Sequence, residues 1–176
     1  MANSSIISRM KDKLITEIIN DEALFYAIDS PTIKKLEDAD RLVGTHIFNY
    51  HQNPLTLKEV QTFLTIQMHI PKTYGANNTW VSPRLEIWII SHQDHMEVDN
   101  IPKITANRND YISQLLDQKF NGRREIGVSK QAKNNLNLFD KLDLISNVEG
   151  ALASDYLYRQ MIFEVKDLND SLCDEE

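Results

Sequence analysis

The sequence of 176 residues is poor in cysteine, glycine and proline, with one, five and five of each. Lone Cys173 excludes an internal disulfide, and it stands beside the acidic end 174–176, where we do not expect an active site. No apolar run approaches the roughly 20 residues that cross a bilayer. The first residues also lack the apolar core of a signal peptide. We therefore expect a protein of a reducing compartment, with no membrane partner.

Basic residues are also in deficit. The chain has 19 Lys and Arg against 26 Asp and Glu, which gives a formal net charge of −7. A protein that holds DNA or RNA by its phosphates needs a basic face. The densest basic cluster here is only Arg123-Arg124, so the composition argues against nucleic-acid binding as the main activity.

Motifs of nucleophilic catalysis and of phosphate binding are missing. The sequence has no G-x-S-x-G elbow, and its glycines never fall two within four residues, as a phosphate loop requires. Cys173 has no basic neighbour that would lower the pKa of its thiol. We therefore predict a protein that is not an enzyme and uses no cofactor.

One cluster of possible metal ligands stands out between residues 91 and 99. His92, Asp94, His95 and Glu97 could in principle bind a metal ion. Their spacing fits no helical H-x-x-x-H pair, and no second cluster of His or Cys completes the shell. We interpret the segment as a solvated loop without metal, and keep a small metal-dependent enzyme as an alternative.

The first 44 residues predict helices. Apolar residues recur every three or four positions from Ile6 to Ile19, and the other face carries charged residues that include Glu17. A second helix is predicted from Asp21. A third is predicted from Ser30 as the N-cap, through Pro31 at the first helical position, to Gly44 as the stop.

Strand patterns follow. Residues 45–50 and 63–70 predict strands, and alternation in 63–70 indicates that one face is buried. Residues 72–82 predict a long loop. Residues 84–91 are apolar on both faces, which predicts the central strand of the sheet.

The second half predicts one helix and a final hairpin. The helix runs from an N-cap at Asn109 or Asp110 to Asn121-Gly122, and residues 126–137 are predicted to be irregular. Two strands, from Leu142 and over 156–168, are predicted to pair antiparallel, with a turn around Glu149-Gly150 and Ser154-Asp155. Arg159 interrupts the apolar face of the last strand, where its head could still reach solvent.

Blocks of like elements favour an α+β fold, with a mostly antiparallel mixed sheet flanked by helices. We divide the chain into an N-terminal helical segment (1–44) that packs on the same domain, an α+β core (45–170) and an acidic tail (171–176).

Two features suggest contacts with other subunits. The N-terminal helix is strongly apolar on one side, so it could dock on a neighbour instead of on its own sheet. Two aromatic residues fall in the predicted loop 72–82, and exposed aromatics are enriched at interfaces. The candidate interface residues are Ile6, Met10, Leu14, Tyr74 and Trp80.

The order of elements resembles a known family. The residues that carry the likeness are 48–51 (FNYH), the strand 84–92, the helix start 107–112 (NRNDYI) and the hairpin strand that ends at 167–169 (DLN). Together they resemble the tail-terminator or head–tail joining (neck) proteins of tailed bacteriophages, in which a strand precedes an R-x-D-x-I helix and a late strand ends in D-x-N. The likeness covers roughly residues 40–170.

This resemblance implies a structural virion protein of the neck or tail end, assembled in the host cytoplasm. The chain would form a homo-oligomeric ring, a hexamer, that caps the tail tube and joins it to the head connector. DNA would pass through the lumen without being specifically bound. A head-closure or other neck protein shares this outline, and a monomeric adaptor or inhibitor of a host protein is an alternative of another class.

Overall fold

The computed structural model describes residues 5–52, 59–70, 73–74, 80–127, 136–138, 140–152, 155–165 and 167–168. At 5–6, 73–74, 80–81, 136–137 and 167–168 it describes the backbone only. Cys173 and the predicted acidic tail lie outside these ranges.

The first two predicted helices are confirmed. Helix α1 spans Ser5–Ile19, and α2 spans Glu22–Ile28. Asp21 caps α2, because its carboxylate accepts a 3.1 Å hydrogen bond from the Leu24 N–H. No helix within the described ranges is long and apolar enough to cross a membrane.

The third predicted helix is wrong. The Ser30 hydroxyl oxygen accepts a 3.0 Å bond from the Ile33 N–H, but residues 33–35 form no helix, and the Lys35 backbone is extended. A 3₁₀ helix, η1, follows at Leu36–Leu42. Its buried residues, Ala39 and Leu42, stand three apart, which matches the three residues per turn of a 3₁₀ helix.

The main sheet has five strands in the order β1-β2-β5-β9-β8. Their bounds are Ile47–Phe48, Thr62–His69, Arg84–His92, Tyr156–Glu164 and Asp143–Ala151, respectively. The β1–β2 pair is parallel and the other pairs are antiparallel. This arrangement confirms the α+β class and places β5 at the centre, as its two apolar faces predict.

Short strands replace parts of the predicted loops. Strands β3 (Thr73–Tyr74), β4 (Trp80–Val81) and β10 (Asp167–Leu168) form a second sheet, so 72–82 is not simply a loop. Strands β6 (Glu125–Ile126) and β7 (Leu136–Asn137) pair with each other at the ends of the segment predicted to be irregular. A 3₁₀ turn, η4 (Gln93–His95), follows β5.

The predicted turn at Glu149-Gly150 is wrong, because β8 continues to Ala151. Gly150 stands opposite Tyr158, and a Cβ added to Gly150 would lie 2.7 Å from the Tyr158 hydroxyl oxygen. A glycine inside a strand often marks such a close approach rather than a turn.

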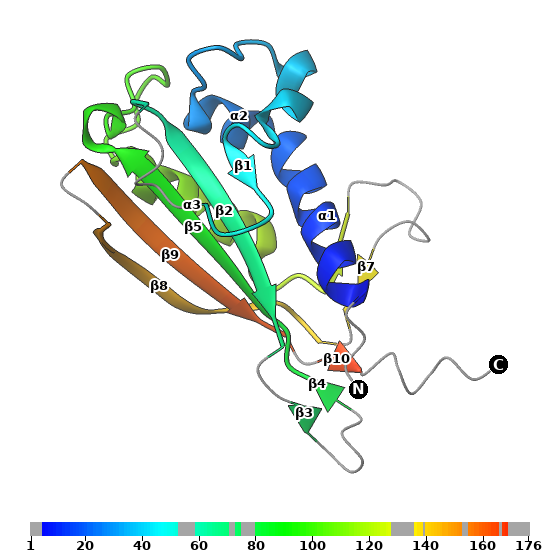
Figure 1. Ribbon diagram of the computed structural model, residues 1–176. Coiled ribbons are helices and arrows are strands. Elements are labelled where there is room, and N and C mark those ends of the chain that lie inside the picture. The colour runs from blue at the N-terminus through cyan, green and yellow to red at the C-terminus, as the bar shows by residue number, and fades with distance from the viewer. Residues whose placement is uncertain are drawn as a thin grey trace.

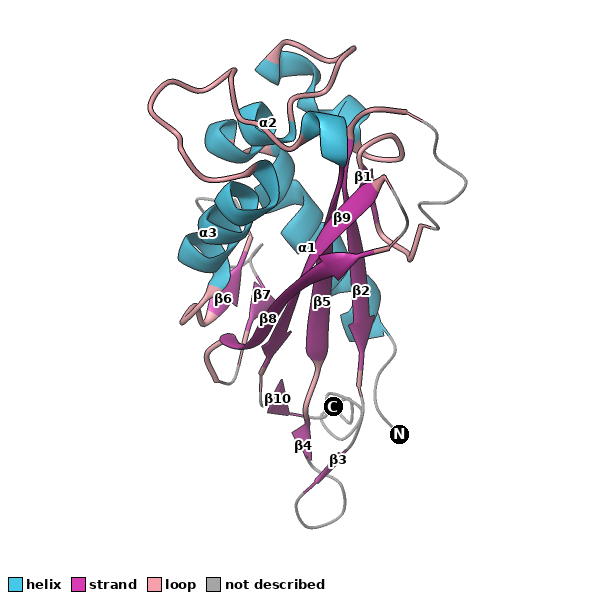
Figure 2. Cartoon of the chain, turned by 90° about the vertical axis from the view of Figure 1, so that its left-hand side faces the viewer, coloured by secondary structure: helices cyan, strands magenta, loops and turns pink. Residues whose placement is uncertain are grey.

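The helices cover one face of the sheet (Figures 1 and 2). Helix α1 packs on β2, and α3 (Arg108–Phe120) packs on β5 and β9. One core joins α1, α2, η1 and α3 to the inner face of the sheet. A smaller cluster on the opposite face is built from Phe48, Phe63, Ile90 and Tyr156.

Glu17 departs from its predicted place on the charged face of the first helix. Its side chain is 3% exposed, and its carboxylate accepts a 2.6 Å bond from Arg123 and a second bond from the backbone N–H of Gly127. The spacing of apolar residues cannot reveal this, because a glutamate in a buried ion pair occupies the same polar positions of a helix as a glutamate exposed to solvent.

Helix α3 begins earlier than predicted. Its N-cap is Asn107, whose Oδ1 accepts a 2.9 Å bond from the Asp110 N–H. Asn109 and Asp110 are therefore not caps, and their side chains serve contacts with the sheet that are described below.

Arg108 is the largest fully buried side chain. Its guanidinium donates hydrogen bonds of 2.7, 2.7 and 2.6 Å to the carbonyl oxygens of His95, Ala27 and Glu97. Asp29 supplies a counter-charge at 3.6 Å. One side chain thus joins the end of α2, the turn after β5 and the start of α3.

Arg108→Lys should lower the free energy of unfolding by about 2–4 kcal/mol, because an ammonium cannot reproduce the planar fork and leaves buried carbonyls without donors. Urea denaturation would measure this. Arg84→Lys is the control: Arg84 forms an ion pair with Glu164 but is 37% exposed, so its loss should cost less than about 1 kcal/mol. Equal losses in the free energy of unfolding for the two variants would contradict the role of Arg108 in joining these three segments.

Candidate assembly surface

The first turn of α3 is bonded to the sheet. The Ser91 hydroxyl of β5 donates a 2.7 Å hydrogen bond to Asn109 Oδ1, and Asn109 Nδ2 donates a 3.2 Å bond to the Leu157 carbonyl of β9. Asp110 accepts a hydrogen bond from Arg159. The R-x-D part of the helix motif therefore has a structural role here: Arg108 holds the loops and Asp110 holds the sheet.

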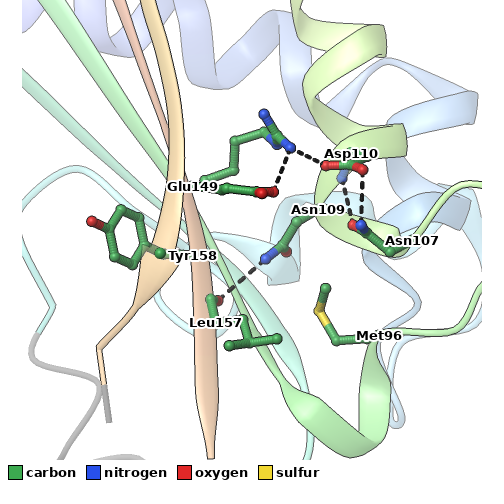
Figure 3. Close-up of a pocket in the computed structure, with 9 residues that line it drawn as sticks. Met96, Asn107, Asn109, Asp110, Glu149, Leu157 and Tyr158 are labelled. Atoms are coloured by element: carbon green, nitrogen blue, oxygen red, sulfur yellow. Dashed lines mark hydrogen bonds and ion pairs between the residues drawn. The ribbon is translucent and has the colours of Figure 1, made fainter.

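Arg159 extends this contact to the edge strand. Its guanidinium donates a 2.9 Å bond to Glu149 Oε2 of β8 (Figure 3). It also donates a 3.0 Å bond to Asn147 Oδ1 of the same strand. The side chain is 17% exposed, so its head reaches solvent only in part. Around this network lies a cleft of about 280 Å³, walled by the first turn of α3 and by β8 and β9.

Strand β8 ends the sheet, and among the described residues only β9 pairs with it. The Leu152 N–H donates to the Tyr156 carbonyl, which makes this a hydrogen-bonded pair. Such pairs alternate along an antiparallel ladder. Asn147, Glu149 and Ala151 therefore direct their N–H and C=O groups outward, away from the sheet.

At the opposite edge of the sheet, strand β1 is capped by the chain itself. The Gly44 N–H donates to the Ile47 carbonyl of β1. Lys11 of α1 donates a 2.6 Å bond to the carbonyl of Asn49, just after β1. The two edges therefore differ: β1 is capped locally, whereas β8 directs backbone groups outward without a partner strand among the described residues.

The β8 edge also exposes apolar side chains. Ile145, at a bulge between Leu144 and Ser146, is 50% exposed, and Val148 is 44% exposed. No Lys, Arg or Pro occurs in β8. These are the residues with which proteins usually block edge pairing.

An aromatic row crosses the outer face of the sheet toward β8. His51 lies edge-on to Trp88 at 5.9 Å between ring centroids, and Trp88 lies 4.8 Å from Tyr158. The Tyr158 ring then covers Gly150 of β8. We call Asn147, Val148, Glu149, Gly150 and Ala151, together with this row, the β8 surface.

The predicted interface residues fall elsewhere. Met10 and Leu14 are fully buried in the chain's own core, so α1 lies on its own sheet and these side chains are not available to a neighbour. Ile6 belongs to α1, Tyr74 to β3 and Trp80 to β4, but their side chains lie outside the described structure. Sequence reasoning missed the β8 surface because the only available signal was a short strand without basic residues.

The candidate metal cluster is dispersed. His92 Nδ1 accepts a 3.1 Å bond from the Asp94 N–H, whereas His95 Nδ1 lies 2.9 Å from the Thr62 hydroxyl. His46 is buried at the Thr62 carbonyl, and His51 contacts Gln67. Within the described ranges, no three His, Cys, Asp or Glu side chains gather as metal ligands.

Asp29, His95 and Thr62 lie in a line that has the order of a catalytic triad. His95 Nε2 is 3.5 Å from Asp29, and its Nδ1 faces Thr62. The Thr62 side chain is fully buried, however, and bonds to the Ser91 hydroxyl at 2.7 Å. A substrate cannot reach that hydroxyl, so this line of contacts acts as a buried polar brace between β2, β5 and α2.

Comparison with known proteins gives one family. The family model described as YomW matches residues 21–165, which covers α2 to the end of the main sheet. The name is that of a Bacillus prophage protein, and the match indicates a phage-related chain. No curated protein matches.

Acidification should destabilise the fold through His95 and His46. Burial and the neighbouring Arg108 lower the pKa of His95, although Asp29 opposes them, and burial lowers the pKa of His46. Below the ordinary histidine value of about 6.5, the unfolded chain therefore binds more protons than the folded one. Stability should be full above that pH and fall below it.

Urea denaturation at pH about 7.5 and about 5.5 would measure this loss. In the variants His46→Asn and His95→Asn, which keep a polar atom near Nδ1, the dependence on pH should be weaker. A wild-type stability that is constant or rising over this acid range would contradict the assignment.

Gly150→Ala should displace the Tyr158 ring. The new methyl group would lie 2.7–2.8 Å from the hydroxyl oxygen, Cε1 and Cζ of Tyr158, so the ring must leave its contact with Trp88. We expect a loss of about 1–3 kcal/mol of stability, with a changed tryptophan emission. In a Tyr158→Ala background the same substitution should cost less, and equal costs in both backgrounds would contradict this packing.

Proposed function

Since the chain belongs to the YomW family, we propose that it is a structural subunit of a phage neck, a ring-forming tail terminator that caps the tail tube and joins it to the head connector. Its role would be binding rather than catalysis, with no cofactor. It would act in the virion, after assembly in the host cytoplasm. The phage-related family and the α+β fold support this setting.

The observation that carries the proposal is the β8 surface. A sheet with helices on one face, a capped β1 edge and an uncapped β8 edge is incomplete on one side. Proteins that act alone often block such edges with lysine, proline or a covering segment, and β8 has no lysine, no proline and no covering segment among the described residues. A subunit that works inside an assembly can leave the edge for a neighbour.

The charge of the chain supports the role as a passage for DNA. At a net charge of −7, the protein has an excess of groups that repel phosphates. DNA that passes through the lumen of such a ring would slide rather than bind.

Deletion of the gene from its phage should give separate heads and tails, with tails of irregular length, because nothing would cap the growing tube. Electron microscopy of lysates would show this. Tails of normal length detached from heads would instead identify a head-closure protein. Normal particles would contradict a role in the neck and favour an adaptor or an enzyme.

Complementation would link this function to the β8 surface. A copy with Val148→Lys should fail to restore joined particles, because a lysine on the edge opposes pairing. Val43→Lys is the matched control: Val43 is also 44% exposed but lies by the capped β1 edge. Restoration by both variants would contradict the use of β8 in the particle.

A further inference from the structure

We propose that the free protein is a two-fold dimer in which the β8 strands of two copies pair antiparallel, centred on Val148. This inference concerns the protein in solution, outside any particle. It goes beyond the proposed function and does not depend on the chain being a neck protein.

The difference between the two edges indicates that the β8 edge pairs with a second copy of the chain. Strand β1 is only two residues long and is bonded within the chain, so it offers the β8 strand of a neighbour little to pair with. Two β8 strands related by a two-fold axis can pair, since each offers the same outward backbone groups. The bulge at Ile145 confines this pairing to the part of β8 that follows it.

When two β8 strands pair in the register centred on Val148, the side chains of one copy are complementary to those of the other. With Val148 on the axis, Asn147 of each copy stands opposite Glu149 of the other copy. Arg159 already donates to Asn147 Oδ1 and to Glu149 Oε2. Among the described residues, Asn147 Nδ2 and Glu149 Oε1 form no further hydrogen bond. Asn147 Nδ2 can therefore donate to Glu149 Oε1 across the axis, twice in the dimer.

The same register covers the exposed valine. Val148 would face its own copy in a pair that lacks backbone bonds, where side chains approach most closely. A register centred on Glu149 would instead place two carboxylates opposite each other, which is unfavourable. A register centred on Asn147 would place Val148 against Ser146. Only the Val148 register pairs apolar with apolar and donor with acceptor.

Pairing would produce one continuous sheet from two five-stranded sheets. The outward groups of Asn147 and Glu149 would then be bonded in both copies. Most of the β8 edge would then be covered, and a covered edge is one way in which soluble proteins avoid aggregation through their sheets.

Disulfide trapping tests the register directly. In a Cys173→Ser background, Val148→Cys places two thiols opposite each other across the axis, at a Cα separation that a disulfide can span. We expect a covalent dimer after mild oxidation, on a gel without reductant, that reductant reverses. Ile145→Cys, equally accessible but facing a different residue of the partner, should cross-link much more slowly. Similar rates for both variants would overturn the register.

Light scattering coupled to size exclusion tests the dimer itself. The wild-type chain should have twice its own mass, and Val148→Lys should raise the dissociation constant by about tenfold or more, since two lysines would then face each other. Val43→Lys should remain dimeric, and thermal unfolding would verify that both variants are folded. A wild-type monomer at all concentrations, or a dimer that Val148→Lys leaves intact, would overturn the inference.

The outcomes separate this inference from the proposed function. A solution dimer together with normal particles from the deleted phage would uphold the dimer and reject the neck role. A stable ring in solution without trapping at Val148→Cys would reject the dimer and leave the neck role standing.

Discussion

The structure depends on the burial of one guanidinium. Arg108 satisfies three carbonyls, one from α2 and two from the turn after β5, at distances of 2.6–2.7 Å, in a place where water does not reach. A buried charge without such partners would be costly. The end of α2, the turn after β5 and the start of α3 can therefore only take positions in which Arg108 keeps these hydrogen bonds. The position of α3 follows, and so do those of Asn109 and Asp110. Through Asp110 and Arg159, the same constraint reaches Asn147 and Glu149 at the edge of the sheet.

Much of the fold could be read from the sequence, because periodicity reports which face of an element is buried. The helices from Ser5 and Glu22, the central strand β5 and the β8–β9 hairpin all follow from such patterns. Where the pattern led to a wrong prediction, a polar residue forms a contact with a distant part of the chain that local spacing does not show. Glu17 is buried by Arg123, and the cap of α3 moved to Asn107 because its neighbours bond to the sheet.

The candidate surface could be predicted much less well. Apolar residues in the N-terminal helix suggested an interface, but Met10 and Leu14 fill the chain's own core. Val148 gave no such signal, because an isolated valine in a short strand has the same pattern whether it is covered or exposed. The order of strands decides this, since β8 is an edge only because no later strand joins it in the part of the chain that the structure describes. Strand order depends on contacts between distant residues, which local patterns do not contain.

The two proposals place competing demands on one edge, and symmetry determines how they relate. A ring whose subunits all face the same way has no two-fold axis between neighbours, so it cannot contain the β8–β8 pair. A dimer of free chains would therefore have to open before a subunit entered such a ring. The backbone groups of Asn147 and Glu149 would exchange one set of partners for another. These groups are hydrogen-bonded both in the dimer and in the ring. Breaking the β8–β8 bonds of the dimer is therefore compensated only where another partner can form bonds with the same groups. An edge of this kind would keep rings from forming away from the end of the tail tube.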